Sequence, residues 1–477
     1  MQLFNTTIFS PFAPKQKGSN YSDFLKKFPG YKLTESLSVL RQTDYPLLDK
    51  NKQVYLDFTG GNLFAKCLVH QHLQLLESGI FGNPHSTNPA SQRSTQLVDD
   101  ARQYVLQYFH AADDYYCIFT PNATGALKIV GECYPFSEES FLLMSLDNHN
   151  SVNGIREFAT QKGAAYQYTP LQKDSLYIDK EILEQHLDHH NDKANKLFAF
   201  PAQSNVSGIK HPLSLIALAK ANGWDVLLDA AAFVPTDILD LRDVKPDFVS
   251  VSFYKIFGYP TGIGCLLMHK NVFNKMNKPW YAGGTITLSA AGYRGHFLKP
   301  NEERFEDGTI NYLNIPAVKM GLQYIENIGM EKITLRINCL ASWLIQQLSE
   351  LEHCNGQKLV QIFGAVNTKR RGGTIVMNFF NKAGRVIPFW KIEAAANEKN
   401  ICIRTGCFCN PGLDETNNNI SNADLQYYFG TRQQGDYFNM IDVTKKLRGS
   451  VRISLGMVSN FNDANSFYEF AKIFLNT

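Results

Sequence analysis

The chain alternates short, wholly apolar stretches with longer amphipathic ones. Apolar stretches of strand length recur before residue 270: YYCIFT (115–120), FLLMSL (141–146), KLFAFPA (196–202), DVLLDAA (225–231), DFVSVSF (247–253) and GIGCLLM (262–268). Segments with helical spacing of apolar residues, such as HPLSLIALAKANGW, separate them. Apolar strands that alternate with helices are typical of a mostly parallel sheet covered on both faces. The pattern therefore predicts an α/β core from about Tyr55 to Glu306.

The pattern changes after this core. Two helical patterns, IPAVKMGLQYIENIGM and LRINCLASWLIQQLSELEHC, precede the strand-like stretches GGTIVMNFF and GSVRISLG. A chain of 477 residues also exceeds the length that one hydrophobic core usually organises. We expect a large α/β domain over residues 51–310, a smaller α+β domain over residues 311–477, and an N-terminal segment, residues 1–50, that packs on the small domain.

Composition narrows the classes of partner. The net charge is only +3, which gives no indication of a nucleic acid or an acidic membrane surface. No run of about 18 apolar residues is present, and the N-terminus MQLFNTTIFSPFAPKQKGSN has proline and polar residues where a signal peptide is apolar. The nine cysteines are odd in number and scattered, unlike a disulfide framework. We expect a cytoplasmic protein that binds neither nucleic acid nor membrane.

The stretch SVSFYKIFGYPTGIG (250–264) places Lys255 directly after a predicted buried strand. One interpretation is a surface lysine just past the strand. The other is an amine whose pKa is lowered by burial, which can form a Schiff base with a carbonyl compound. This stretch alone leaves both open.

Two further features follow predicted strands. In YYCIFTPNATGALKIVGE a strand leads into a helix that begins near Ala123, where free N–H groups and the Thr124 hydroxyl suit a phosphate, although a plain helix cap has the same pattern. Asp229 ends another strand, either as a helix cap or as the partner of the protonated ring nitrogen of pyridoxal 5'-phosphate. Both, like Lys255, belong to the edge where open α/β sheets bind ligands, which favours a pyridoxal phosphate site.

The stretch ICIRTGCFCNPG gathers three cysteines: Cys402, Cys407 and Cys409. No fourth ligand follows at zinc spacing, so we assign no metal site. Buried structural thiols are one interpretation. The other is a reactive thiol, because the flanking glycines and proline indicate a shaped, exposed loop and Arg404 favours the thiolate.

Several motifs of the chain resemble those of one enzyme group: VYLDFTGGNLF, FGNPHS, QSNVSGIKHPL, SFYKIFGYPTGIG, RFEDGT and RTGCFCNPG. The group is the class V aminotransferase and cysteine desulfurase group of fold-type I pyridoxal phosphate enzymes. Within it, the N-terminal desulfurase domain of molybdenum cofactor sulfurases is the most similar, from about Leu40 to Gly456. The resemblance implies a large domain with a mostly parallel sheet of the seven-stranded type and a smaller α+β domain. Those sulfurases carry a further domain that binds the molybdenum cofactor, and since this chain ends at Thr477 we expect that domain to be missing.

The resemblance also implies roles for single residues. Lys255 bonds to the cofactor and Asp229 pairs with its ring nitrogen. The implied phosphate contacts are Ala123, Thr124, Ser252, Tyr254 and, reaching across from the other copy of a homodimer through WYAGGTITLS, Thr285. His149 covers the ring, with Asn148 as the alternative register. The implied substrate-binding residues are Arg452 for the carboxylate, His85, and Asn205, which also lies near the phenolic oxygen. The glutamine that the group carries after the aspartate is replaced by Ala232.

The function implied is that of a cysteine desulfurase-like sulfurtransferase. Lys255 takes the α-proton of L-cysteine, the sulfur passes to Cys409 as a persulfide, and alanine is released; the sulfur acceptor is unidentified. Cys407 is the alternative nucleophile, because both thiols face the same way if the segment is extended. Another class V reaction, that of a lyase, epimerase or aminotransferase, would not need Cys409. A non-catalytic partner in sulfur delivery would not need Lys255, Asp229 and Thr124 intact.

Overall fold

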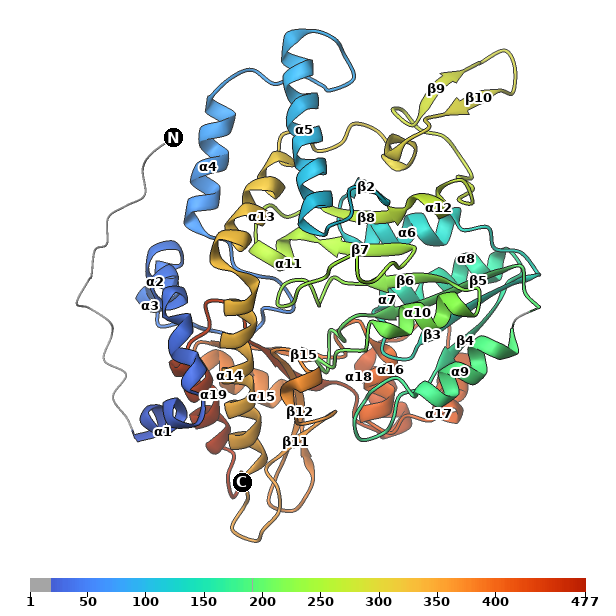
Figure 1. Ribbon diagram of the computed structural model, residues 1–477. Coiled ribbons are helices and arrows are strands. Elements are labelled where there is room, and N and C mark those ends of the chain that lie inside the picture. Colours follow the sequence, from blue (N-terminus) through green and yellow to red (C-terminus); the bar gives the residue numbers. More distant parts are fainter. Residues whose placement is uncertain (1–18, 191) are drawn as a thin grey trace.

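The computed structural model describes residues 19–190 and 192–477. The described part of the chain begins with four short helical elements: α1 (Ser19–Lys27), η1 (Pro29–Thr34), α2 (Glu35–Asp44) and α3 (Pro46–Lys50). They lie against α14 (Met330–Ser349) and α19 (Phe461–Lys472) (Figure 1). The Phe24 ring contacts Trp343 and Phe461, and Arg41 pairs with the buried Asp463 at 2.6 Å. Residues 1–18 of the predicted N-terminal segment lie outside the described residues.

The centre of the molecule is a seven-stranded sheet. Its strands are β2 (Tyr115–Thr120), β3 (Ser140–Ser145), β4 (Ala165–Thr169), β5 (Asn195–Pro201), β6 (Asp225–Asp229), β7 (Phe248–Ser252) and β8 (Gly264–His269). Their order is β2-β8-β7-β6-β5-β3-β4, and only β8 runs antiparallel to its neighbours. The predicted α/β fold with a mostly parallel sheet is confirmed. The edge strand β4 was not among the predicted strands, because its sequence AYQYT is largely exposed and lacks an apolar run.

Successive residues of the strands enter two separate hydrophobic clusters, one on each face of the sheet. Ile118 and Leu227 pack with Leu127 of α6, whereas Phe119 and Leu228 belong to the cluster that includes the helices α5 and α10. The helices of this region are α4 (Lys66–Glu77), α5 (Pro89–Tyr108), α6 (Ala123–Cys133), α7 (Asn150–Asn153), α8 (Ile155–Gln161), α9 (Lys180–His189), α10 (Ser214–Ala221), α11 (Phe253–Phe257) and α12 (Lys270–Phe273). Helices on both faces explain why the central strands are apolar throughout.

A second, antiparallel sheet follows in the order β11-β12-β16-β15, with β13 paired to β12. Its strands are β11 (Val360–Ile362), β12 (Thr374–Phe380), β13 (Val386–Ile387), β15 (Arg404–Gly406) and β16 (Ser450–Ser454). The remaining elements of this region are η3 (Thr368–Arg370), α13 (Pro316–Ile328), α15 (Phe389–Glu398), α16 (Pro411–Asn417), α17 (Asn422–Gly430) and α18 (Tyr437–Thr444). β1 (Val54–Tyr55) pairs with β14 (Ile401–Cys402) in a separate two-stranded sheet, and a bridge from Asp57 to Ser454 of β16 ties the start of the large region to the second sheet.

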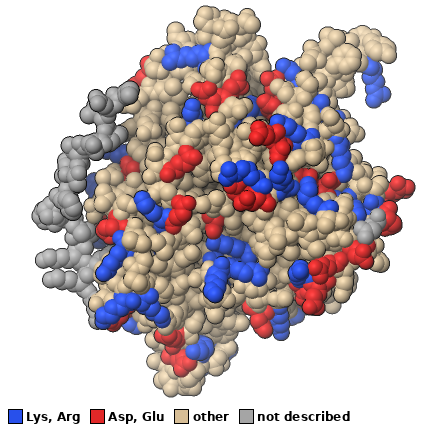
Figure 2. Space-filling model, in the orientation of Figure 1, with Lys and Arg blue, Asp and Glu red and all other residues tan. Residues whose placement is uncertain are grey.

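Two surface features complete the fold. The hairpin β9 (Ile286–Ser289) and β10 (His296–Leu298) extends away from the body of the molecule, and η2 (Glu302–Phe305) follows it (Figure 1). On the face shown in Figure 2, basic and acidic side chains are interspersed, in keeping with the small net charge. Across residues 19–190 and 192–477, every helix is too short or too polar to span a membrane.

Candidate active site

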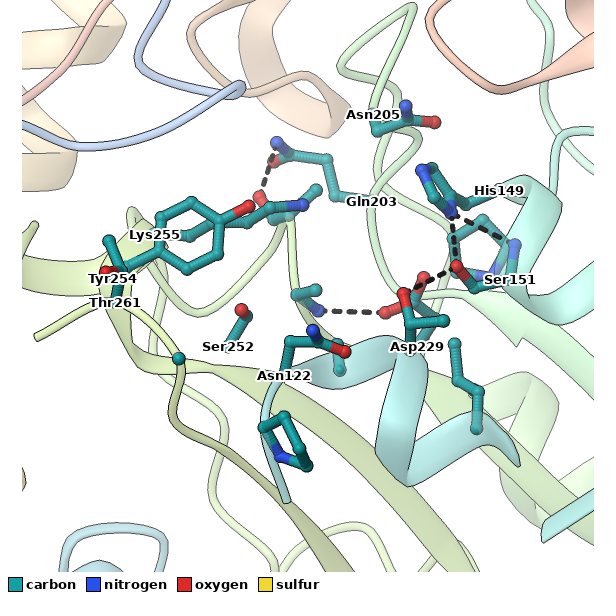
Figure 3. Close-up of a pocket in the computed structure, with 18 residues that line it drawn as sticks. Asn122, His149, Ser151, Gln203, Asn205, Asp229, Ser252, Tyr254, Lys255 and Thr261 are labelled. Atoms are coloured by element: carbon teal, nitrogen blue, oxygen red, sulfur yellow. Dashed lines mark hydrogen bonds between the residues drawn. The ribbon is translucent and has the colours of Figure 1, made fainter. Parts of the chain in front are cut away.

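A cavity of about 310 Å³ lies at the carboxyl ends of β2, β5, β6 and β7. Eight of the predicted site residues line it: Ala123, Thr124, His149, Asn205, Asp229, Ser252, Tyr254 and Lys255. Figure 3 shows His149 and Ser151 on one side of the cavity and Tyr254, Lys255 and Thr261 on the other. The parallel strands place these residues together because their carboxyl ends share one edge of the sheet.

Lys255 lies on α11, directly after β7, with its amine in the cavity. Burial lowers the pKa of this amine, the charges of Arg452 and Arg404 lower it further, and Asp229 and Cys409 oppose the shift. Its Nζ makes no hydrogen bond or ion pair with another described residue. A lowered pKa increases the fraction of neutral amine near pH 7, which is the form that can bond to a carbonyl carbon or accept a proton.

Asp229 is the last residue of β6, and hydrogen bonds hold one of its two carboxylate oxygens. Its Oδ1 accepts hydrogen bonds from the Ser250 hydroxyl at 2.9 Å and from the backbone N–H of Ala231 at 3.1 Å. Its Oδ2 has no hydrogen-bond partner among the described residues. A carboxylate held in this way presents one oxygen to a cationic group in the cavity.

The start of α6 lines the same cavity. The Asn122 side chain caps the helix by accepting from the Gly125 N–H at 2.9 Å, and Ala123 and Thr124 of the same first turn line the cavity. The Thr124 and Ser151 hydroxyls lie 2.8 Å apart. Gly264 of β8 allows the loop to approach, since a Cβ there would lie 2.6 Å from the Asn122 backbone. Ser151 was missed in the sequence, although it stands two residues after His149.

The structure separates His149 from Asn148. His149 lines the cavity, and its Nδ1 accepts from the Ser151 N–H at 3.1 Å, so a neutral His149 carries its proton on Nε2. Burial lowers the pKa of His149, which favours this neutral form. Asn148 is fully buried, and its amide donates to the carbonyl oxygens of Ser145 at 2.8 Å and Ala199 at 3.0 Å. Adjacent residues point to different surroundings, which sequence register alone could not resolve.

Gln203 is a cavity residue that the sequence reasoning missed. It follows β5, and its amide donates to the carbonyl oxygen of Ala232 at 2.9 Å. Its buried Oε1 has no partner among the described residues. A glutamine from the neighbouring strand thus lies against the backbone of Ala232, the position where the resembled group carries a glutamine. The signal was available, because Gln203 in AFPAQSN is a polar residue at the same sheet edge.

Arg452 of β16 lies beside the cavity and is almost completely buried. Its guanidinium donates to the carbonyl oxygen of Asn205 at 2.8 Å and to Asp57 Oδ1 at 2.8 Å. Arg404 donates to Asp57 Oδ2 at 2.7 Å. Burial lowers the pKa of Arg452, and the Asp57 carboxylate opposes that shift. Asp57, which the sequence reasoning did not select, balances two arginines next to the site.

The cysteine loop is not extended. Phe408 and Cys409 have φ angles of +58° and +55°, so the chain turns between Cys407 and Cys409. Burial, the Asp414 charge and the neighbouring Cys407 thiol raise the pKa of the Tyr437 hydroxyl of α18, so Cys407 faces Tyr437. Cys409 is exposed, and its carbonyl oxygen accepts from the backbone N–H of Asn150, next to His149, at 2.7 Å. The two thiols therefore have different surroundings.

His85 and Thr285 lie away from the cavity around Lys255. His85 is exposed and lines another cavity of about 1030 Å³, together with Gly283 and Gly284 at the base of the hairpin. Thr285 is fully buried, and its hydroxyl accepts from the Ala282 N–H at 2.9 Å and donates to the Ala282 carbonyl at 2.8 Å. Within one chain, neither side chain reaches the site.

The residues of the cavity fit pyridoxal 5'-phosphate. A helix start with two adjacent hydroxyls suits the phosphate, and the Asp229 oxygen suits a protonated ring nitrogen. The Lys255 amine suits the aldehyde, and the buried Gln203 Oε1 marks a further polar position that no described residue satisfies. The fit rests on complementary chemistry at several separate points of one cavity.

Comparisons with known proteins agree with this geometry. The family model described as Aminotransferase class-V matches residues 54–467. The chain belongs to this family. Molybdenum cofactor sulfurase of Arabidopsis thaliana is 32% identical over 94% of the chain and 60% of its own length. The human molybdenum cofactor sulfurase is 35% identical over 91% of the chain and 51% of its own length. This class-V chain thus spans between half and three fifths of these curated relatives.

The fold of this class-V chain is also that of solved cysteine desulfurases. The apo structure of the cysteine desulfurase from Thermococcus onnurineus NA1 superposes with a TM-score of 0.75 at 22% identity. The superposition covers 91% of this chain and 97% of the other. The predicted fold-type I architecture is confirmed.

Proposed function

We propose that this class-V protein binds pyridoxal 5'-phosphate and transfers the sulfur of L-cysteine to Cys409. The observation that carries the proposal is that the loop of the exposed Cys409 is bonded to the cavity of Lys255 and Asp229: the Asn205 amide, which lines that cavity, donates to the Phe408 carbonyl at 2.8 Å. The printed names of the relatives, molybdenum cofactor sulfurase, and of the solved structure, cysteine desulfurase, support it.

Each side chain has a task that follows from its position. The bound cofactor supplies an electron sink for the substrate's α-carbon. The Lys255 Nζ, whose pKa is lowered by burial, takes the α-proton. The Arg452 guanidinium, with its unpartnered buried Nε, binds the substrate carboxylate next to Asn205. His149 covers the cavity and holds a proton on Nε2.

Sulfur transfer completes the reaction. The Cys409 thiolate attacks the sulfur of the bound cysteine, and an S–S bond forms as the C–S bond breaks. The carbon skeleton takes up a proton and leaves as alanine, while Cys409 keeps the sulfur as a persulfide. Atoms balance, since cysteine and a thiol become alanine and a persulfide. The exposure of Cys409 leaves the persulfide open to an acceptor, and the relatives' names favour the molybdenum cofactor in that role.

The test is incubation of the cofactor-loaded protein with L-cysteine. We expect one equivalent of sulfur to add to the protein, as measured by intact mass, and alanine to accumulate at the same rate. Treatment with a thiol reductant should remove the added mass and release sulfide. Alanine without added protein sulfur would indicate a lyase instead, and a chain that produced neither alanine nor sulfide would contradict the proposal.

We also propose that the protein is a homodimer in which the β9–β10 hairpin covers the partner. Leu288, Tyr293 and Phe297 of this hairpin are 61%, 78% and 67% exposed, and an isolated two-stranded ribbon is marginal in water. A two-fold dimer would bury these side chains and bring the hairpin base with His85 and Thr285 towards the other copy.

Phe297→Asp is expected to convert the dimer to a monomer and to weaken cofactor binding, because a charge is placed on the covered face. Light scattering and a cofactor titration measure the two effects. Leu33→Asp, at an equally exposed leucine on η1, is the matched control and should leave the dimer intact. A wild-type monomer with full activity would overturn the dimer.

The cytoplasm is the compartment that we propose. All nine cysteines are free, including the exposed Cys354 and Cys409, as expected of a chain kept in a reducing environment.

A further inference from the structure

The loop that carries Cys409 has an unfavourable backbone conformation. Phe408 and Cys409 are consecutive non-glycine residues with positive φ. L-amino acids other than glycine keep this left-handed backbone conformation only where surrounding contacts stabilise it. The backbone N–H of Asn150 donates to the Cys409 carbonyl at 2.7 Å, and the Asn205 amide donates to the Phe408 carbonyl at 2.8 Å. The conformation of the loop therefore depends on contacts from other segments.

Asn410 provides a central contact of this kind. Its side chain is fully buried, and its Nδ2 donates both to the carbonyl oxygen of Asp147 at 2.6 Å and to Asn205 Oδ1 at 3.0 Å. Its Oδ1 caps α16 by accepting from the Leu413 N–H at 3.2 Å, and its backbone N–H donates to the Cys407 carbonyl at 3.0 Å. Both amide hydrogens and the amide oxygen of Asn410 are thus used.

These bonds join the cysteine loop to the rest of the site. Asp147 and Asn150 flank His149 in the segment that covers the cavity, and Asn205 lines the cavity. The Asn205 amide is held on one side by Asn410 and donates on the other to the loop. Asn410 therefore fixes three segments, around residues 147–150, 203–205 and 407–410, relative to one another.

We propose that Asn410 is a positioning residue that holds the Cys409 thiol at the distance and angle that sulfur transfer requires. The inference rests on the proposed role of Cys409 as sulfur carrier. It implies that the loop does not swing towards an acceptor, so the acceptor approaches Cys409 in place. The covalent link to the cofactor, which depends on Lys255, does not depend on Asn410, because Asn410 bonds to Asp147, Asn205 and Leu413 and not to Lys255 or Asp229.

Asn410→Asp removes only the two hydrogen bonds that the Asn410 side chain donates. An aspartate has the same shape and still accepts from the Leu413 N–H, so the helix cap is kept. It cannot donate to Asp147 or Asn205, whose oxygens it would repel. We expect persulfide formation on Cys409 to slow by about a hundredfold, the cost of misplacing a reacting group by about 1 Å. The reducible link between the cofactor and Lys255 should remain, because Asn410 makes no hydrogen bond to Lys255 or Asp229.

A second readout does not use turnover. Alkylation of Cys409 by iodoacetamide, followed by peptide mass spectrometry, should become faster in Asn410→Asp, because the loop is no longer held. Asn460→Asp makes the same change at the cap of α19, far along the chain, where the side chain accepts from the Asp463 N–H, and should behave as wild type. If Asn410→Asp does not fold, Asn410→Ser serves as the second test variant, because serine also keeps an acceptor for the helix cap.

The outcomes separate two questions. Wild-type rates of alkylation and persulfide formation in the Asn410 variants would overturn the positioning role. Wild-type protein that forms no persulfide with cysteine would overturn the proposed function, while the alkylation comparison would still decide whether Asn410 holds the loop.

Discussion

Lys255→Ala is expected to lower alanine formation from L-cysteine by about 10³-fold or more, because one amine serves both as the bond to the cofactor and as the base. No other lysine lines the cavity in the described part of the chain. Borohydride reduction followed by mass analysis should attach the cofactor to the wild-type protein and not to the variant. Removing a buried amine without an ion pair should leave the free energy of unfolding of the cofactor-free protein unchanged or higher.

Lys210→Ala is the matched control for this experiment. Lys210 is also largely buried, but it pairs with Asp237 at 2.7 Å outside the cavity. We expect this variant to keep the reducible cofactor link and its activity, with some loss of stability from the unpaired Asp237. An active Lys255→Ala protein would overturn the catalytic site as described.

Cys409→Ala is expected to abolish the sulfur mass that cysteine adds to the protein and to remove most alanine formation. The thiol is needed to accept the sulfur, whereas the cofactor link needs Lys255 and the cavity. The variant should therefore still attach the cofactor in a form that borohydride can reduce. It should also still bind cysteine, as measured by absorbance. Intact-mass analysis after incubation with cysteine measures the loss.

Cys407→Ala serves as the comparison within the same loop. Its thiol neighbours the Tyr437 hydroxyl, so its removal should reduce the rate by loosening the contact with α18 and leave persulfide formation in place. Reversed phenotypes would identify Cys407 as the carrier. Normal alanine formation in both variants would indicate that the protein is a lyase that releases sulfide, and that no sulfur is transferred to the protein.

Much of the fold follows from local patterns. The six predicted strands are buried on both faces, so their apolar runs were visible without any knowledge of their neighbours. The helix start at Ala123, the strand end at Asp229 and the position of Lys255 just after β7 were equally local signals. The edge strand β4 lacked such a signal, because an exposed strand is held by its neighbour β3 and not by its own apolar residues.

The sequence by itself determined the six buried strands of the large sheet, the sheet edge at which Ala123, Asp229 and Lys255 lie, and the types of residue gathered there. Only the tertiary structure decided which of two neighbours faces the cavity. His149 and Asn148 are adjacent, and Cys407 and Cys409 are separated by one residue, so their directions depend on backbone angles such as the positive φ of Phe408 and Cys409. Those angles are held by Asn205 and Asn410, which are more than 200 positions apart in the chain. Contacts between such distant residues leave no local pattern, since they form only when the two sheets come together.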